Sequence, residues 1–167
     1  MITALILADG RIEPLAATLA ALVPGVAEGL VADAVVIATK DEPEVAAIAE
    51  GVGAAHLRVG EGKDVWSGGM ALARRDWLLC LDAGDVPVDG WINALERFVA
   101  FGGERRIGRL SKSSLRSRAG GVGETLFGAS RIRPGHLVHR ALLGEAGLRS
   151  RVRPARIGAR LERPSGF

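Results

Sequence analysis

The fold of this chain is decided by the stretch LLCLDAGDVP at residues 78–87. Its first four residues are apolar, which is typical of a buried β-strand, and two carboxylates, Asp82 and Asp85, follow directly. In α/β proteins, loops at the carboxyl ends of parallel strands bind the ligand, and paired carboxylates there can bind the divalent metal of a phosphate group. The alternative is an ordinary turn, in which Asp82 caps the loop and Gly84 supplies a positive φ.

Strand and helix patterns alternate around this stretch. They predict strands at 3–8, 34–38, 56–59 and 77–81, and helices at 14–23, 41–50, 67–74 and 91–101. The strands are almost continuously apolar, as in a parallel sheet covered on both faces. Right-handed crossovers then give an α/β fold with a doubly wound, mostly parallel sheet and its site at the carboxyl ends of the strands. Four aspartates fall at or just beyond these ends: Asp9, Asp41, Asp82 and Asp85.

The second part of the chain has a different character. Residues 102–167 are rich in Arg, Ser and Gly, and their periodicity is weak. We expect a loop at 111–117, a short strand or helix at 137–143, and a loosely packed tail at 149–167. A length of 167 residues fits a single domain, in which residues 1–101 form the main half and residues 102–167 a short basic region and tail.

The net charge of +3 conceals a division between these two parts. Residues 1–101 contain 7 Lys and Arg against 15 Asp and Glu, whereas residues 102–167 contain 15 against 4. The basic part favours an anionic partner, such as a phosphate, a lipid headgroup or nucleic acid, although a solvated arginine-rich surface would give the same composition. Nucleic acid ranks last among these partners, because Phe127 and Phe167 are the only aromatic residues of the basic part.

The sequence also carries signals about the compartment. Cys80 is the single cysteine and lies within an apolar strand, so we expect a core residue in a reducing environment. No basic segment precedes an apolar stretch at the amino end, and no apolar run approaches the ~20 residues of a transmembrane helix. We expect a cytoplasmic protein, for which peripheral contact with the inner face of a membrane through its arginines stays open.

A longer segment around the acidic loop resembles a known family. The segment WLLCLDAGDVPVDGWINALERFV, residues 77–99, is similar to the central part of family-2 glycosyltransferases, which are inverting enzymes of the GT-A fold. The similarity includes the Pro, Gly and Trp that follow the acidic motif, and it extends loosely over residues 1–101. The resemblance implies that residues 1–101 bind a nucleotide-sugar linked to UDP or GDP. It also implies that residues 102–167 face a glycan or lipid hydroxyl as acceptor.

The resemblance further implies roles for individual carboxylates. Asp82 and Asp85 would hold Mg²⁺ or Mn²⁺ on the diphosphate of the donor, although Gly84 stands where the family usually has an aspartate. Asp9 and Asp41, together with Asp82, would line the nucleotide pocket.

Two further roles follow from the same resemblance. His139, or alternatively His136, would complete the metal shell, while a three-residue spacing equally fits plain surface positions. An inverting transfer needs a carboxylate that takes the proton of the acceptor hydroxyl. Glu145 is the first candidate for this base and Glu124 the second, because they are the only acidic residues between 105 and 161; the alternative is that neither acts.

Two other functions stay open. The opening LILADGR at residues 5–11 resembles that of sugar-phosphate nucleotidyltransferases, but those enzymes need a nearby lysine and residues 12–39 contain none. A non-catalytic scaffold is the other alternative, since the family's Ala-Arg-Asn motif is absent around residues 66–68. The sequence therefore predicts a nucleotide-sugar transferase, with a nucleotidyltransferase or a binding domain as rivals.

Overall fold

The computed structural model describes residues 1–60, 63–88, 90–112 and 129–164. Within them, one large sheet has the strand order β3-β2-β1-β4-β7-β6-β10-β5, and β8 and β9 form a separate hairpin. The strands are β1 (Ile2–Leu7), β2 (Val31–Ala38), β3 (Ala55–Arg58), β4 (Trp77–Asp82), β5 (Val86–Pro87), β6 (Ile107–Lys112), β7 (His136–His139), β8 (Leu143–Gly144), β9 (Gly147–Leu148) and β10 (Pro154–Glu162). The helices are α1 (Ile12–Ala27), α2 (Pro43–Gly51), α3 (Val65–Leu72), α4 (Trp91–Phe101) and the short 3₁₀ helix η1 (Arg140–Leu142).

The amino-terminal part of the sheet is parallel. Strand β1 lies between β2 and β4 and pairs in parallel with both, and β3 pairs in parallel with β2. Leu5 stands opposite Val35 on one side and Cys80 on the other. All three side chains are fully buried, which explains why these strands are apolar throughout. The predicted α/β class with a mostly parallel sheet is confirmed.

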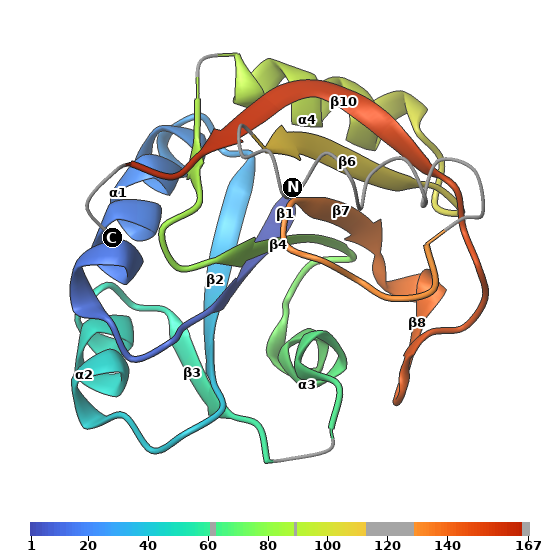
Figure 1. The fold of residues 1–167 in the computed structure, drawn as a ribbon. Helices are drawn as coiled ribbons and strands as arrows, with labels where there is room; N and C mark the ends of the chain where they lie inside the picture. Colours follow the sequence, from blue (N-terminus) through green and yellow to red (C-terminus); the bar gives the residue numbers. More distant parts are fainter. Residues whose placement is uncertain (61–62, 89, 113–128, 165–167) are drawn as a thin grey trace.

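Helices cover both faces of the sheet (Figure 1). Helices α1, α2 and α4 pack on one face, where Leu79 and Leu81 of β4 are buried. Helix α3 covers the other face together with part of the chain after residue 128, and Leu78 and Cys80 are buried there. Burial raises the pKa of the Cys80 thiol well above its usual value, as expected for a core cysteine. Successive side chains of β4 are thus buried on opposite faces of the sheet. This double burial fixes the strand that leads into the acidic loop.

The carboxyl-terminal region departs from the expected loose tail. Residues Pro154–Glu162 form β10, which pairs in parallel with β6 and in an antiparallel manner with β5. Ile157, Ala159 and Leu161 are buried at every second position, while the residues between them are exposed. The two-residue period is present in the sequence, but it is short, and the prolines at 154 and 164 together with the many arginines favoured a loose tail. In Figure 1, β10 runs over the same side of the molecule as α4 and β6.

Two smaller expectations also need correction. Helix α1 was predicted to end before Pro24 but continues to Ala27. Pro24 lacks an amide donor, yet it lies in the last turn and its carbonyl accepts a 2.9 Å hydrogen bond from Glu28. Residues 137–143 contain both predicted alternatives, since β7 is followed by the turn of η1. The expected loop at 111–117 begins within β6, and its remainder lies outside the described residues.

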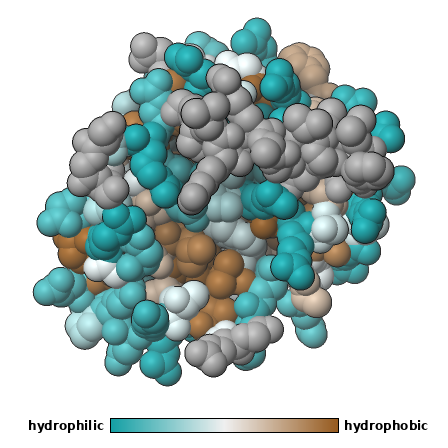
Figure 2. Space-filling view, in the orientation of Figure 1, coloured by the Kyte–Doolittle hydropathy of each residue, from teal (hydrophilic) through white to brown (hydrophobic). Residues whose placement is uncertain are grey.

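The surface is mixed in character. Figure 2 shows a hydrophobic area in the lower part of one face, where β2 and α3 lie in Figure 1, surrounded by hydrophilic residues. Among the helices that the structure describes, none is long and apolar enough to span a membrane.

Candidate functional site

The loop after β4 is fixed to the first part of the fold. The amide of Ala83 donates to the carbonyl of Leu7 at 2.9 Å. The amide of Gly84 donates to the Pro14 carbonyl at 3.0 Å and to the Thr18 hydroxyl at 2.8 Å. Gly84 has a φ of +93°, a left-handed conformation that favours glycine. The loop is therefore held against both β1 and α1, and its position is set before any ligand binds.

Asp85 closes this loop on itself. Its side chain is only 2% exposed, and its Oδ2 accepts a 3.0 Å hydrogen bond from the amide of Asp82. In return, the amide of Asp85 donates to the carbonyl of Asp82 at 3.0 Å. A buried carboxylate needs donors or cations to offset its loss of water. The structure brings Asp82 and Asp85 together as predicted, with Asp85 the more deeply buried of the two.

Two cations from the second half of the chain complete the site. Lys112 Nζ lies 2.7 Å from Asp85 Oδ2 and 3.7 Å from Asp82 Oδ2. Arg163 Nη2 lies 3.1 Å from Asp85 Oδ1 and 3.3 Å from Asp82 Oδ2. We call these four residues the ion cluster. Its formal charges cancel, and each cation bridges both carboxylates.

The two aspartates of the ion cluster differ in exposure. The side chain of Asp82 is 32% exposed, against 2% for Asp85. Burial raises the pKa of Asp82 above its usual value of 3.8, and the neighbouring charge of Asp85 acts in the same direction. Lys112 and Arg163 oppose this shift without cancelling it. The folded structure therefore makes the charged form of Asp82 less favourable than it is in water, as is common for functional groups.

The loops after β1 and β2 contain the other predicted carboxylates. Asp9 is half-exposed and pairs with Arg11 at 2.6 Å; this hydrogen bond lowers the pKa of Asp9. Asp41 is exposed, and no hydrogen bond or ion pair joins its side chain to the other described residues. Its neighbour Glu42 instead packs against Gly10, where a Cβ would lie 2.9 Å from Glu42 Oε1. Glu42 Oε2 is buried and has no hydrogen-bond partner among the described residues.

Sequence reasoning missed Glu42 because it lies beside Asp41, and periodicity does not say which of two adjacent carboxylates turns inward. The sequence contains no signal that separates the two, since the contact of Glu42 with Gly10 depends on tertiary packing.

The predicted histidines separate along β7. His139 stands opposite Trp77, the first residue of β4, with ring centroids 5.2 Å apart, and its Nε2 lies 3.9 Å from Glu104. Asp82 ends the same strand, about 16 Å further along at the usual rise of a strand. The structure therefore does not bring His139 to the acidic pair. His136 lies nearer that end and is 1% exposed, and its Nδ1 accepts from the amide of Arg133 at 3.3 Å.

The ion cluster does not offer a divalent cation the ligands it needs. Both Asp85 oxygens and Asp82 Oδ2 already face nitrogen donors of the chain. No group of three or more His, Cys, Asp or Glu side chains in the described parts of the chain could hold a metal ion. Mg²⁺ and Mn²⁺ require several oxygen ligands in a regular geometry. Lys112 and Arg163 supply positive charge where the sequence predicts the metal.

Of the two candidate bases, the structure describes Glu145. Glu145 is exposed in the turn between β8 and β9, and Glu124 lies outside the described residues. The Ser67 hydroxyl donates to the Gly144 carbonyl at 2.7 Å, which attaches this hairpin to the first turn of α3. Because α3 follows β3, its first turn lies at the carboxyl ends of the parallel strands. Glu145 lies on this hairpin and is not part of the ion cluster.

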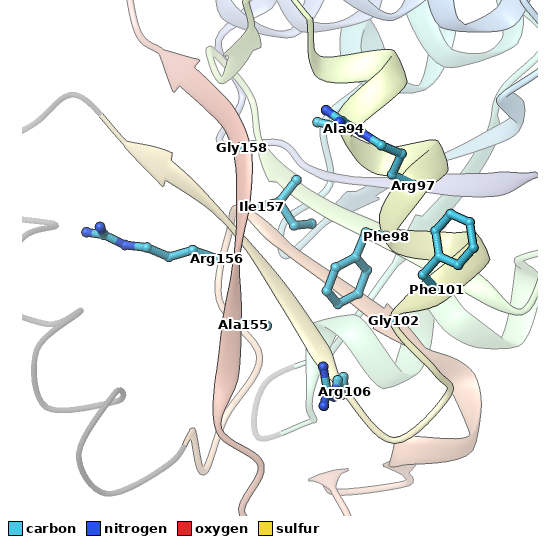
Figure 3. Close-up of a pocket in the computed structure, with 10 residues that line it drawn as sticks. All are labelled: Ala94, Arg97, Phe98, Phe101, Gly102, Arg106, Ala155, Arg156, Ile157 and Gly158. Carbon is cyan, nitrogen blue, oxygen red and sulfur yellow. The ribbon is translucent and has the colours of Figure 1, made fainter.

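A separate hollow lies between α4 and β10 and has a volume of about 380 Å³. Phe98 and Ile157 point toward its interior, whereas Arg156 points to the opposite side of β10 (Figure 3). None of the predicted site residues lines it. The hollow is therefore distinct from the ion cluster, which lies beyond the other end of β10.

The arrangement of strands and helices is similar to that of known transferases. Glucosyl-3-phosphoglycerate synthase from Mycobacterium tuberculosis, solved with Mn²⁺, UDP and phosphoglyceric acid, superimposes with a TM-score of 0.64 and 15% identity, covering 86% of this chain and 57% of that chain. The same synthase with Mn²⁺ and UDP-glucose gives a TM-score of 0.61 and 15% identity, with 85% and 57% covered. A nucleotidyl transferase from a Methanothermobacter species gives 0.56 and 17%, with 95% and 88% covered. No protein-family model and no curated protein sequence matches the chain.

These similarities establish the fold. At such low identities they confirm the GT-A-like arrangement predicted from the acidic segment, while membership of family 2 stays a prediction. The chain spans little more than half the length of the synthase.

Proposed function

We propose that this protein transfers a sugar from a UDP- or GDP-linked donor to a hydroxyl group, with inversion at the sugar carbon. The observation that carries the proposal is the Asp82–Asp85 pair at the carboxyl end of the central strand β4 in a GT-A-like sheet. Ligands of such sheets bind at this edge, where the loops after β1, β2 and β4 meet. The synthase with a similar fold was solved with UDP and with UDP-glucose, which supports a donor of this class.

The nucleotide would bind between the loops after β1 and β2. Asp9 and Asp41 are exposed there, and the unpartnered Oε2 of Glu42 can accept a hydrogen bond from a nucleobase N–H or a ribose hydroxyl. The diphosphate would then extend toward Asp82 at the neighbouring strand end. In this proposal residues 1–101 bind the donor.

The acceptor would approach from the side formed by residues 102–167. Their excess of arginine suits a glycan, lipid or small molecule that carries anionic groups. Glu145 would take the proton of the acceptor hydroxyl while its oxygen bonds to the sugar carbon. The bond from that carbon to the diphosphate breaks on the opposite face, and the nucleoside diphosphate leaves with the electron pair. Glu124 is the alternative base.

The sequence also predicts Mg²⁺ or Mn²⁺ at Asp82, Asp85 and His139. The proposed transfer uses no metal, because His139 lies at the far end of β4 and the oxygens of the acidic pair face Lys112 and Arg163. Mn²⁺ in the synthase structures keeps a metal-assisted mode as the alternative.

Nucleotide binding by matched variants tests the donor site. We expect Glu42→Gln to weaken UDP or GDP binding about 10-fold, because a hydrogen bond to a charged acceptor is replaced by a neutral one. Glu44→Gln is the matched control, since Glu44 is exposed on the first turn of the same helix. Isothermal titration measures both affinities, and release of UDP or GDP from a panel of sugar donors then measures turnover. Failure to bind any nucleoside diphosphate, with or without Mn²⁺, would exclude this function.

A nucleotidyltransferase is the second candidate. The Methanothermobacter nucleotidyl transferase is covered over 88% of its length, against 57% for the synthase, so its size fits this chain better. In that reaction a sugar phosphate oxygen attacks the α-phosphorus of a nucleoside triphosphate and pyrophosphate leaves. Release of pyrophosphate rather than a nucleoside diphosphate would favour it. Nucleotide binding without either product would instead favour a non-catalytic binding domain.

A further inference from the structure

We propose that Lys112 and Arg163 take the place of a divalent cation at the diphosphate, so that the protein binds a nucleoside diphosphate without metal. The inference rests on the proposed function, because it concerns the diphosphate of the same donor.

The first support is the way in which each cation bridges the acidic pair. Arg163 Nη2 is 3.1 Å from Asp85 and 3.3 Å from Asp82, and Lys112 Nζ is 2.7 Å and 3.7 Å from the same two carboxylates. A metal ion held by a pair of carboxylates would also contact both. The two side chains together carry the same charge as Mg²⁺ or Mn²⁺, so the ion cluster has the charge balance of a metal-loaded pair.

The second support is that both cations are fixed by the sheet. Lys112 ends β6, where it stands in register with Leu161 of β10. Glu162 pairs with Val86, the residue after Asp85, which sets Arg163 beside the acidic loop. Strand pairing thus places both charges before a ligand arrives. Charges that are already in position stabilise an anion without the cost of rearrangement.

The third support is that Arg163 keeps donors for a phosphate. Its side chain is 45% exposed, and its contacts with the acidic pair all come from Nη2. A guanidinium has five N–H donors, and its planar fork suits phosphate oxygens. The side chain lies over Gly84, where the position of a Cβ is 3.5 Å from Arg163 Nε. The guanidinium can therefore contact the carboxylates on one side and a diphosphate on the other.

This arrangement also serves the transfer step. When the bond from the sugar carbon to the diphosphate breaks, the electron pair stays on the diphosphate oxygen and its negative charge increases. Lys112 and Arg163 stabilise that charge, and neither needs to give up a proton. Preorganised cations near a leaving phosphate are an established source of rate enhancement.

The experiment is a titration of the whole protein with UDP and with GDP, in EDTA and in MnCl₂. We expect binding in EDTA with a dissociation constant within about threefold of that in MnCl₂. Binding that needs MnCl₂ would overturn the inference and leave the proposed function standing. Absence of binding in both buffers would overturn the proposed function itself.

Variants of the exposed arginine identify the group that binds. Arg163→Gln should weaken binding in EDTA about 10- to 100-fold, the usual effect of losing a charge-assisted hydrogen bond to phosphate. Arg163→Lys, which keeps the charge, should recover part of the loss. Arg156→Gln removes the same charge from β10 on a side chain that points away from α4, and should change the affinity less than about threefold. Equal losses in the Arg156 and Arg163 variants would contradict the inference.

A final comparison separates replacement of the metal from competition with it. With Arg163→Gln, Mn²⁺ should restore part of the binding, because the oxygens of Asp82 and Asp85 that faced the guanidinium are then open to a metal. If the arginine merely blocked a metal site, Arg163→Gln would bind UDP more tightly in MnCl₂ than the natural protein does. Thermal unfolding of each variant confirms that it is folded. Lys112 is left intact because its loss would leave Asp85 buried beside one cation.

Discussion

The two halves of the chain differ in charge and in how directly their sequence reports their structure. Residues 1–101 carry a net charge of −8, and their strands and helices follow from apolar runs and helical stripes. Residues 102–167 carry +11, and β10 was not predicted from their sequence. Yet Lys112 and Arg163 of the basic half neutralise Asp82 and Asp85 of the acidic half. Part of the charge difference between the halves is therefore neutralised inside the folded protein, where charges of opposite sign from the two halves pair with one another.

The largest effect is expected when Asp85, the buried carboxylate of the ion cluster, is removed. We expect Asp85→Ala to lower the free energy of unfolding by about 2–4 kcal/mol, because the Asp82 amide loses its buried acceptor and Lys112 loses its nearest carboxylate. Urea unfolding followed by circular dichroism measures the change. Asp41→Ala, on an exposed side chain, should stay within about 0.5 kcal/mol. A loss below about 1 kcal/mol for Asp85→Ala would show that the ion cluster does not join the halves.

A double-mutant cycle sharpens the comparison between the halves. Asp85→Ala, Lys112→Ala and the double variant should give a coupling energy of about 2 kcal/mol, since the two groups lie 2.7 Å apart and Asp85 is 2% exposed. The same unfolding measurement supplies all three values. Additive effects would mean that Lys112 stabilises the fold through contacts other than Asp85.

A smaller effect is expected within the acidic half. Thr18→Val keeps the shape of a fully buried side chain but removes the hydroxyl that accepts from the Gly84 amide at 2.8 Å. We expect a loss of about 1–2 kcal/mol in the free energy of unfolding, because the amide loses one of its two acceptors. Thr39→Val, at an exposed position, is the matched control. If both variants were equally stable, α1 would not be needed to fix the acidic loop.

The smallest effect depends on pH. Burial raises the pKa of Asp82 in the folded protein above 3.8, so the folded state binds a proton more readily than the unfolded state does. Ionisation of Asp82 then lowers the free energy of unfolding as the pH rises from 3.8 through the higher pKa of the folded protein. Asp82→Asn should therefore gain stability relative to the natural protein near pH 7 and lose this advantage as pH falls below the native pKa toward 3.8. Denaturant unfolding at several pH values checks the trend; a gain that grows at low pH would contradict it.

Much of the first half was accessible from sequence because its signals are local. The run before Asp82 had to be a buried strand, and the glycine after it allowed the left-handed turn that the structure contains. The GT-A-like fold followed from the same segment. Ile157 was less accessible, because its strand β10 is stabilised by pairing with β6, a contact distant in the sequence, and it lies in an arginine-rich segment between two prolines. Glu42 was hidden because only the packing against Gly10 distinguishes it from Asp41.

The sequence by itself determined the main strands of residues 1–101 and the acidic loop after β4, because apolar spacing and turn residues act between near neighbours. Only the tertiary structure decided which charges meet. Asp82 and Arg163 are 81 residues apart in the chain, and they come together because β10 lies between β6 and β5 in the sheet. That strand order is set by packing of the whole domain. The same packing places His139 at the far end of β4 from the acidic pair. It places Lys112 and Arg163 beside that pair.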